Sequence, residues 1–290
     1  MSPSPGRKLR DAIEQATIQV PGAPNALVAR MIEQAGYDAM YLSGAAFSAG
    51  VLGLPDVGLF TLTELVQQTT FLTRGVSLPL IVDADTGFGE TVNVERTVIE
   101  LEAAGAAAIQ LEDQVLPKRC GHLAGKKLVT PKEMCDKLRA ANDARLDPDL
   151  VLIGRTDARG VTGLDDAIDR AKRYLDAGAD WIFPEALASR DEFERFAREV
   201  EAPLVANMTE FGKGPLLNLE ELAQLGYSVV LYPVTLLRVA MKATEAALAV
   251  IAAEGSQESV LDLMQTREEL YELLDYAVYE ERDQQRASEN

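Results

Sequence analysis

The sequence predicts an α/β chain folded as a (β/α)8 barrel with extra helices at its C-terminal end. Four segments share one pattern, in which a helical stretch and a glycine precede an apolar run: QAGYDAMYLSG, AAGAAAIQLED, DAGADWIFPEA and QLGYSVVLYPV. Seven residues after each glycine the chain reaches Ser43, Glu112, Glu185 and Pro233. A glycine in the left-handed region ends a helix and lets the chain turn into a strand. The seventh residue is therefore expected at the C-terminal end of a buried strand.

Four further apolar runs complete the predicted set of strands: TIQVP (17–21), LPLIVDAD (78–85), LVLIGRTD (150–157) and APLVANMT (202–209). Runs that are apolar on both faces are typical of parallel strands covered on both sides. Eight such strands alternating with helical segments favour a (β/α)8 barrel. An open doubly wound sheet is the alternative, but the first strand leads into QVPGAPNAL, which lacks the glycine-rich phosphate turn of that fold.

The predicted organisation is a single barrel domain over residues 1–290, with 256–290 as a C-terminal helical extension. The extension contains SVLDLMQTREELYELLDYAVYEERD, which goes beyond what a barrel needs. It carries an apolar stripe that must be buried against something, such as a neighbouring subunit: Val260, Leu263, Met264, Leu270 and Leu273.

Charge and composition restrict the class of protein. The 290-residue chain has a formal net charge of -18, which argues against nucleic acid and anionic membranes as partners. It has no apolar run long enough for a membrane span, no apolar signal core at its N-terminus, and only two cysteines. We therefore expect a cytoplasmic protein. An anionic substrate would require arginines, lysines or a metal ion to make the site locally positive.

Carboxylates at the predicted strand ends indicate a metal site. Asp83 and Asp85 are two residues apart, so on an extended strand they face the same way, and Glu112 ends the next strand. An all-oxygen cluster of this kind suits Mg2+ or Mn2+. The alternative is that Asp85 and Thr86 cap the following helix.

Other polar residues fall at the same end of the predicted barrel. Arg155 directly follows the strand LVLIG and either binds an anionic ligand or pairs with an acidic neighbour. Glu185 and Asn207 also have two interpretations. Each either contacts a ligand or is a buried side chain whose hydrogen bonds are made within the protein. Arg238 lies in the first turns of the helix after the eighth strand, near the usual anion-binding corner of such barrels.

The segment PKRCGH (117–122) combines one of the two cysteines, Cys120, with the single histidine, His122. Lys118 and Arg119 precede the thiol, and cations favour thiolate. Cys120 and His122 are too close in sequence for a usual zinc pair, and no second histidine is present to act as a base. The remaining interpretations are a proton donor or acceptor beside an anion, or an ordinary surface loop. The other cysteine, Cys135, is expected to pack on a helix.

Together these stretches resemble the isocitrate lyase and phosphoenolpyruvate mutase superfamily. KRCGH is similar to its lyase signature, and matching motifs run in order along almost the whole chain: YLSGAAFSAGVLGLPDVG, DADTGFG, AAIQLEDQVLPKRCGHL, IGRTDA, NMTEFG, LYPV and MQTREELYE. The resemblance implies a homotetramer of barrels that exchange their last helices. It also implies Mg2+ at Asp83 and Asp85, with Glu112 close by.

The resemblance further implies which residues handle the substrate. The implied catalytic residues are Cys120, Tyr41, Arg155 and Asp56. The implied substrate contacts are Ser43, Gly44, Ala45, Arg119, Gly121, His122, Glu185, Asn207, Thr209, Arg238 and Arg267.

The implied activity is Mg2+-dependent retro-aldol cleavage of a small tricarboxylate, 2-methylisocitrate, to pyruvate and succinate, a step of the methylcitrate cycle of propionate catabolism. Tyr41, helped by Arg155, is the predicted base for the substrate hydroxyl, and Cys120 is the predicted acid that protonates the carbanion. A closing loop would keep water away from that proton transfer.

Two departures from the family pattern bear on the activity. Gln110 stands where some members have histidine, which excludes a histidine acid at that position. The segment NMTEFGKGP replaces the serine-rich stretch of the longer isocitrate lyases, which favours the methyl-bearing substrate. Isocitrate, 2,3-dimethylmalate, phosphonopyruvate and oxaloacetate stay as alternative substrates, and a non-catalytic barrel that binds an organic acid is a further alternative.

Overall fold

Eight parallel strands form the centre of the part of the chain that the structure describes, residues 3–121, 123 and 125–288 of a computed structural model. The strands are β1 (Ile18–Pro21), β2 (Met40–Leu42), β3 (Leu80–Asp83), β4 (Ala108–Glu112), β5 (Val151–Thr156), β6 (Trp181–Pro184), β7 (Val205–Asn207) and β8 (Val229–Tyr232). They form two sheets, in the orders β2-β3-β4-β5-β6 and β1-β8-β7. Single parallel bridges, Gly22 to Tyr41 and Ile182 to Leu204, join the two sheets into a ring.

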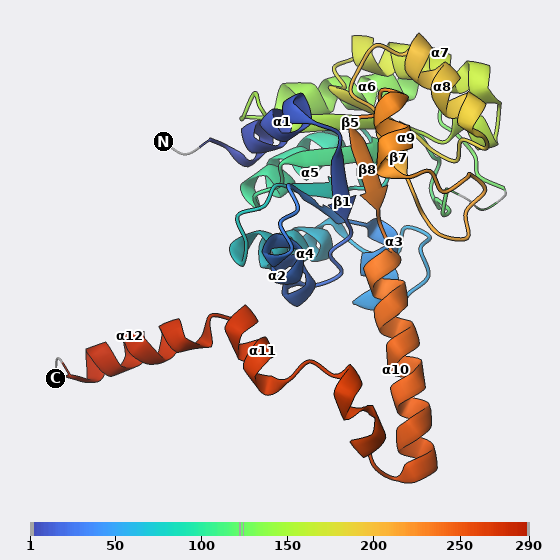
Figure 1. Cartoon of the computed structure of the whole chain (residues 1–290). Helices are drawn as coiled ribbons and strands as arrows, with labels where there is room; N and C mark the ends of the chain where they lie inside the picture. Colours follow the sequence, from blue (N-terminus) through green and yellow to red (C-terminus); the bar gives the residue numbers. More distant parts are fainter. Residues whose placement is uncertain (1–2, 122, 124, 289–290) are drawn as a thin grey trace. The chain divides into compact units, whose positions relative to one another are not determined.

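Helices alternate with these strands and lie around them (Figure 1). They are α1 (Pro5–Gln15), α2 (Ala26–Gln34), α3 (Gly44–Gly50), α4 (Leu62–Arg74), α5 (Thr91–Ala103), α6 (Pro131–Ala144), α7 (Leu164–Asp176), α8 (Arg190–Glu199) and α9 (Leu219–Gln224), with the short 3-10 helix η1 (Ala158–Gly160) after β5. The helix α10 (Thr235–Glu254) follows β8 in the chain. The predicted (β/α)8 barrel is confirmed.

The glycine spacing in the sequence marks helix ends, as predicted. Gly36, Gly105, Gly178 and Gly226 have φ angles of 81°, 94°, 106° and 89°, in the left-handed region that ends a helix. The seventh residue after each glycine is the last residue of a strand or the residue directly after it. The polar side chains at these positions are therefore delivered to one end of the barrel.

Apolar side chains fill the barrel in two layers. One cluster contains residues that alternate along the strands, such as Ile81, Ile153 and Val229, and it fills the inside of the ring. A larger cluster, with Val82, Leu152 and Val230, lies between the strands and the helices. Leu9 of α1 belongs to the inner cluster, so α1 packs against the interior of the ring.

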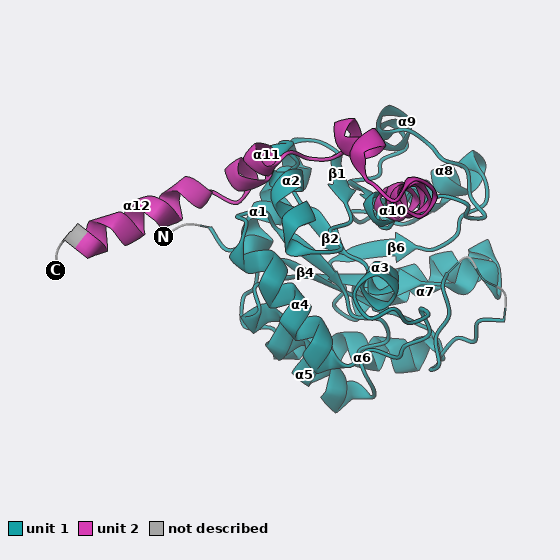
Figure 2. Cartoon of the chain, turned by 90° about the horizontal axis from the view of Figure 1, so that it is seen from below, with its two compact units in different colours: residues 1–237 teal, residues 238–290 magenta. Residues whose placement is uncertain are grey.

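The described chain divides into two compact units, residues 1–237 and 238–290 (Figure 2). The second unit holds most of α10, the 3-10 helix η2 (Glu258–Leu263), α11 (Arg267–Leu273) and α12 (Tyr276–Ser288). The predicted boundary at residue 256 lies inside this unit. Its apolar side chains are largely exposed, among them Leu248 at 62% and Leu263 at 85%. None of the described helices is both long and apolar enough to cross a membrane.

The closure of the ring gives the first testable prediction. A Cβ atom on Gly22 would lie 2.1 Å from the carbonyl oxygen of Pro233, so backbone meets backbone where β1 approaches the end of β8. Gly22→Ala should lower the free energy of unfolding by about 1–3 kcal/mol, because no side-chain rotation relieves this overlap. Chemical denaturation measures the change.

Gly75→Ala is the matched control. A Cβ atom there would have its nearest neighbour at 3.7 Å, the Nε atom of Arg30, and the residue has a negative φ of -95°. It should change the free energy of unfolding by less than about 0.5 kcal/mol. Equal stability of the two variants would contradict the close approach at Gly22.

Candidate active site

The polar residues of the site come from the C-terminal ends of neighbouring strands. In the strand register Asp83 of β3 stands beside Gln110 of β4, and Glu112 of β4 stands beside Arg155 of β5. All four side chains are buried, at the end of the barrel where this class of fold carries its chemistry. The strand ends that carry the predicted polar residues are therefore neighbours in the sheet.

Asp83 accepts hydrogen bonds on both carboxylate oxygens. Its Oδ1 accepts from Gln110 Nε2 at 3.1 Å and from the amide of Asp85 at 3.2 Å, and its Oδ2 accepts from the amide of Gly44 at 3.2 Å. A Cβ atom on Gly44 would lie 3.1 Å from Asp85 Oδ1 and 3.3 Å from Asp83 Oδ2. Glycine at position 44 thus lets the backbone approach both carboxylates closely. Ser43 is the N-cap of α3, and its hydroxyl oxygen accepts a hydrogen bond from the amide of Ala46 at 3.3 Å.

Asp85 occupies a turn that is strained and firmly held. Its φ angle is 48°, a left-handed conformation that is uncommon for a residue other than glycine and clusters at functional sites. Its carbonyl oxygen accepts a hydrogen bond from the amide of Glu112 at 2.8 Å, which joins this turn to the end of β4. The alternative that Asp85 and Thr86 cap a helix is wrong, because α5 begins at Thr91 and its N-cap is Glu90.

Lys118 brings a cation to this cluster from the loop after β4. Its ammonium lies 2.8 Å from Asp85 Oδ1 and also pairs with Asp56, and its side chain is 4% exposed. Burial alone would lower the pKa of Lys118, but the carboxylates of Asp85, Glu112, Asp83 and Asp56 outweigh it and raise the pKa well above its ordinary value. The charge of Lys118 is thus paired with carboxylates, and its predicted effect on the Cys120 thiol stays a prediction.

Burial raises the pKa values of two carboxylates in this cluster, Asp85 and Glu112. Burial raises the pKa of Asp85 to about 7, with Lys118 opposing the rise and Asp83 adding to it. Burial also raises the pKa of Glu112 well above its ordinary value, and Arg155 opposes that rise. Carboxylates taken out of water resist ionisation unless cations neutralise them, which makes this cluster a strong cation-binding environment.

Arg155 forms ion pairs with three buried carboxylates, Glu112, Asp157 and Glu185, and this group of four side chains is called the salt-bridge hub. Its guanidinium lies 3.3 Å from Glu112 Oε2, 3.0 Å from Asp157 Oδ2 and 3.3 Å from Glu185 Oε2. The Cζ atom of Arg155 lies over the Phe183 ring, 5.1 Å from the ring centroid. Of the two interpretations of Arg155, the structure shows pairing with acidic neighbours.

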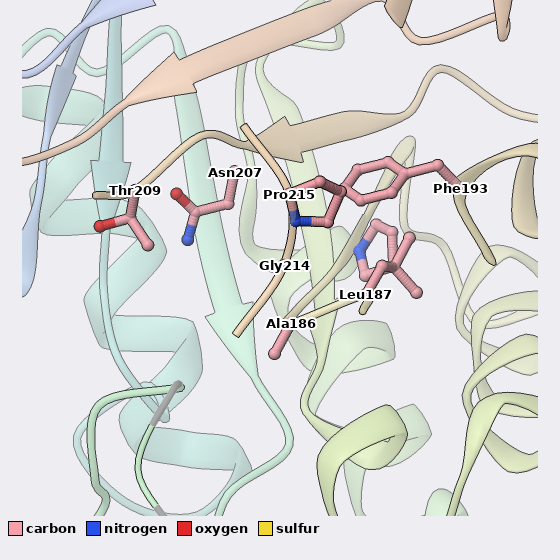
Figure 3. Close-up of a pocket in the computed structure, with 8 residues that line it drawn as sticks. Ala186, Leu187, Phe193, Asn207, Thr209, Gly214 and Pro215 are labelled. Carbon is pink, nitrogen blue, oxygen red and sulfur yellow. The ribbon is translucent and has the colours of Figure 1, made fainter. Parts of the chain in front are cut away.

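Glu185 and Asn207 contact each other across β6 and β7. Asn207 Nδ2 donates to Glu185 Oε2 at 3.3 Å, whereas the buried Oδ1 of Asn207 has no hydrogen-bond donor. Beside them lies a small cavity of about 10 Å³, which has room for about one water molecule. Thr209, Leu187 and Pro215 are among its walls (Figure 3). This cavity is too small for a tricarboxylate.

The loop that contains Cys120 leaves β4 and returns before α6. Gln114 bridges to Leu128 at its base. The Gln114 side chain also clamps the backbone of Arg119, accepting from its amide at 2.9 Å and donating to its carbonyl at 2.8 Å. Cys120 is half-buried, and the Arg119 side chain is exposed. The predicted substrate contact His122 lies outside the described residues.

Gly121 places the backbone of this loop directly against the salt-bridge hub. A Cβ atom on Gly121 would lie 2.4 Å from Glu185 Cγ and 2.7 Å from Arg155 Nη2. Only glycine therefore allows this approach, which sets the neighbouring Cys120 at the edge of the site.

Tyr41 is a hydrogen-bond donor rather than a ready base. Its hydroxyl donates to Gln110 Oε1 at 3.0 Å. Burial raises the pKa of the Tyr41 phenol well above its ordinary value, and the Asp83 carboxylate raises it further. A phenol in this environment keeps its proton, so the geometry argues against the predicted role of Tyr41 as the base.

The predicted metal ligands fit a divalent cation in their chemistry but are not assembled around one point. Among the described residues, no three Asp, Glu, His or Cys side chains are grouped as ligands of one ion. The cations of Lys118 and Arg155 pair with Asp85 and Glu112 instead. Yet the donors are buried carboxylate oxygens, and Glu112 Oε1 has no hydrogen-bond donor. An oxygen donor set with an unsatisfied buried anion suits Mg2+ or Mn2+.

The structure adds Lys126 to the site, and it places two of the predicted contacts in the second unit. The predicted contacts Arg238 and Arg267 lie in the second unit, so their roles stay predictions. Asp157 and Lys126 form a buried ion pair at 2.6 Å beside Arg155. Asp157 ends the run LVLIGRTD, and this position at a strand end indicates a site residue. Lys126 lies in a loop without hydrophobic periodicity, so no sequence pattern indicates that it belongs to the site.

These features define a class: a (β/α)8-barrel protein with a buried carboxylate cluster, a salt-bridge hub and a cysteine loop at the C-terminal ends of its strands. The phosphoenolpyruvate phosphomutase family model matches residues 9–252. The chain belongs to this family.

Individual relatives extend the match beyond the family. The chain is 54% identical to the 2-methylisocitrate lyase of Aeropyrum pernix over 96% of this chain and 90% of that protein. It is 47% identical to the 2-methylisocitrate lyase of Escherichia coli over 96% and 95%.

Solved structures support the same placement. A crystal structure of 2,3-dimethylmalate lyase is similar with a TM-score of 0.92 and 33% identity, covering 98% of this chain and 96% of that one. A phosphonopyruvate hydrolase complexed with oxalate and Mg++ has a TM-score of 0.85 and 31% identity, covering 99% and 98%. A member of this structural class thus binds Mg2+.

The salt-bridge hub gives the second prediction. Arg155→Met should lower the free energy of unfolding by about 3–5 kcal/mol at neutral pH, because it leaves Glu112, Asp157 and Glu185 buried with fewer cations. Since the pKa of Glu112 is already raised in the folded protein and Arg155 opposes that rise, the variant should gain stability as the pH is lowered from 8 to 5. Denaturation across this pH range measures both effects.

Arg159→Met is the control for Arg155. Arg159 pairs with Glu192 at 2.7 Å, but both side chains are more than 20% exposed, so about 1 kcal/mol or less should be lost. A hub variant that is no less stable than this control, or whose stability falls with decreasing pH, would contradict the buried hub.

Proposed function

We propose that this protein is a carbon–carbon lyase that cleaves 2-methylisocitrate to pyruvate and succinate. The observation that carries the proposal is the identity of 45–54% to relatives named 2-methylisocitrate lyase, over at least 92% of this chain in each case. The similar solved structures named for 2,3-dimethylmalate and phosphonopyruvate are only 31–33% identical. The methyl-bearing tricarboxylate is therefore the better-supported substrate.

Asp83 and Asp85, with Glu112 nearby, are the residues that would hold Mg2+. When bound, the ion would acidify the substrate hydroxyl and neutralise charge on the substrate carboxylates. The chain's own contribution is to bury these oxygens, to bring the Gly44 backbone against them, and to balance their charge with Lys118 and Arg155.

The reaction needs a proton removed and a proton returned. Transfer of the hydroxyl proton to a water molecule in the site allows the bond between the hydroxyl-bearing carbon and the adjacent carbon to break, which releases pyruvate and leaves the electron pair on the succinate fragment. Cys120 donates its thiol proton to that carbon, and succinate is complete. Arg155, whose guanidinium neighbours the Gly121 backbone, supplies positive charge beside this step.

The remaining predicted contacts belong to the same proposal. Ser43, Gly44 and Ala45, with Glu185, Asn207, Thr209, Arg119, Gly121 and His122, would position the substrate carboxylates. Asp56 would act through Lys118, with which it pairs. A homotetramer that exchanges C-terminal helices would cover the exposed apolar side chains of the second unit, and Arg238 and Arg267 are proposed substrate contacts.

A substrate comparison tests the function. The purified protein with Mg2+ should release pyruvate from 2-methylisocitrate, with kcat/KM at least about tenfold above that for isocitrate or 2,3-dimethylmalate, since one methyl or carboxylate group is worth about 1–3 kcal/mol or more in a pocket. A coupled 2-oxo acid assay and product chromatography measure it. Turnover of another substrate in place of 2-methylisocitrate would overturn the proposal, and oxaloacetate and phosphonopyruvate belong in the panel.

The two cysteines provide a matched test of the acid. Cys120→Ser should lower kcat by about 10²–10⁴-fold, because a hydroxyl is a far weaker acid than a thiol. Cys135→Ser should keep near-normal turnover, since Cys135 is a buried residue of α6 whose thiol donates to the carbonyl of Arg173 at 3.4 Å. Steady-state kinetics with circular dichroism as a folding check measure both. Near-normal activity of Cys120→Ser would remove Cys120 from the mechanism.

A further inference from the structure

A second buried cation of the Cys120 loop, Lys126, has no part in the mechanism so far. Its side chain is 2% exposed, and its Nζ lies 2.6 Å from the Oδ1 of the fully buried Asp157. Taking two such charges out of water costs several kcal/mol for each ion, and a hydrophobic pair is often as stable. A contribution to the stability of the fold is therefore a weak explanation for a buried lysine at position 126.

The same ammonium makes a second contact, with the loop itself. Lys126 Nζ donates to the carbonyl oxygen of Gly121. Gly121 follows Cys120 directly, and its backbone lies against Arg155 and Glu185, where no Cβ atom would fit. Lys126 thus holds the peptide that carries the proposed acid against the salt-bridge hub.

Asp157 ties this contact to the barrel. Its Oδ2 accepts from Arg155 Nε at 3.0 Å, while its Oδ1 pairs with Lys126. Its own amide donates to Asp113 Oδ1 at 2.9 Å, which anchors it to the end of β4. One fixed carboxylate therefore orients both the guanidinium of Arg155 and the ammonium of Lys126.

We propose that Lys126 is a positioning residue for proton transfer by Cys120. Through Gly121 and Asp157 it sets the place of the cysteine relative to Arg155. The inference rests on the proposed function for its kinetic consequence, but the placement of Cys120 is independent of the substrate. A residue that acts in this way should affect the chemical step more than substrate binding.

Lys126→Met tests the proposal, with Lys127→Met as the matched control because Lys127 is adjacent and exposed. Lys126→Met should lower kcat for 2-methylisocitrate by about 100-fold and change KM by less than about threefold, as expected for misplacement of a catalytic group by about 1 Å. Lys127→Met should match the wild type. A kcat of Lys126→Met within twofold of the control would overturn the proposal.

Lys126→Arg covers the case in which the methionine variant does not fold. It keeps a positive charge for Asp157 but replaces the compact ammonium by a planar guanidinium, whose donors point elsewhere. We expect kcat to fall at least about tenfold. Where both variants fold, Lys126→Arg should keep more activity than Lys126→Met. Wild-type turnover in Lys126→Arg would contradict a positioning role.

Alkylation separates this proposal from the proposed function, since it needs no substrate. The rate of Cys120 modification by iodoacetamide, followed by peptide mass spectrometry, should rise at least threefold in Lys126→Met and be unchanged in Lys127→Met. The buried Cys135 serves as the internal reference for global unfolding. An unchanged Cys120 rate would overturn the positioning role, whereas absence of pyruvate release by the wild type would overturn only the function.

Discussion

The architecture of the site depends on one electrostatic constraint, the burial of acidic side chains at the C-terminal end of the barrel. Asp83, Asp85, Glu112, Asp157 and Glu185 are each at most 5% exposed. Isolated carboxylates cannot stay ionised there, so cations must be built in beside them. Arg155 provides one from a strand, and Lys118 and Lys126 provide two from a single loop. In a chain with a net charge of -18, these three cations offset part of the negative charge at the place where it would meet an anionic substrate.

The same constraint explains why the Cys120 loop has a defined place. Its lysines pair with carboxylates of different strands, Asp85 after β3 and Asp157 after β5, while Gln114 clamps the backbone of Arg119. The charges that neutralise the site are therefore the charges that attach the loop to it. Binding of a divalent cation at Asp83 and Asp85 would compete with Lys118 for Asp85, so metal and loop are linked through one carboxylate.

Much of the fold could be predicted from the sequence, because glycine spacing and apolar runs are local signals. The positions of Ser43, Glu112 and Glu185 at strand ends follow directly from that periodicity. The partners of each polar residue could not be predicted in the same way: the sequence left Arg155 open between ligand and salt bridge, and suggested that Lys118 acts on the thiol. The acidic partners of these two cations are set by long-range contacts, Arg155 with Glu185 and Lys118 with Asp56, which no local pattern announces. The sequence left the role of Asp85 open between a metal ligand and a helix cap, because only the nearby glycines indicate its left-handed turn.

The most direct test of this account is to locate a divalent cation in the protein. Crystals grown with Mn2+ can be measured at wavelengths where manganese scatters anomalously. The account predicts an anomalous peak in contact with the carboxylates of Asp83 or Asp85, with the ammonium of Lys118 displaced from Asp85. A peak away from these residues, or no peak in crystals saturated with Mn2+, would contradict it.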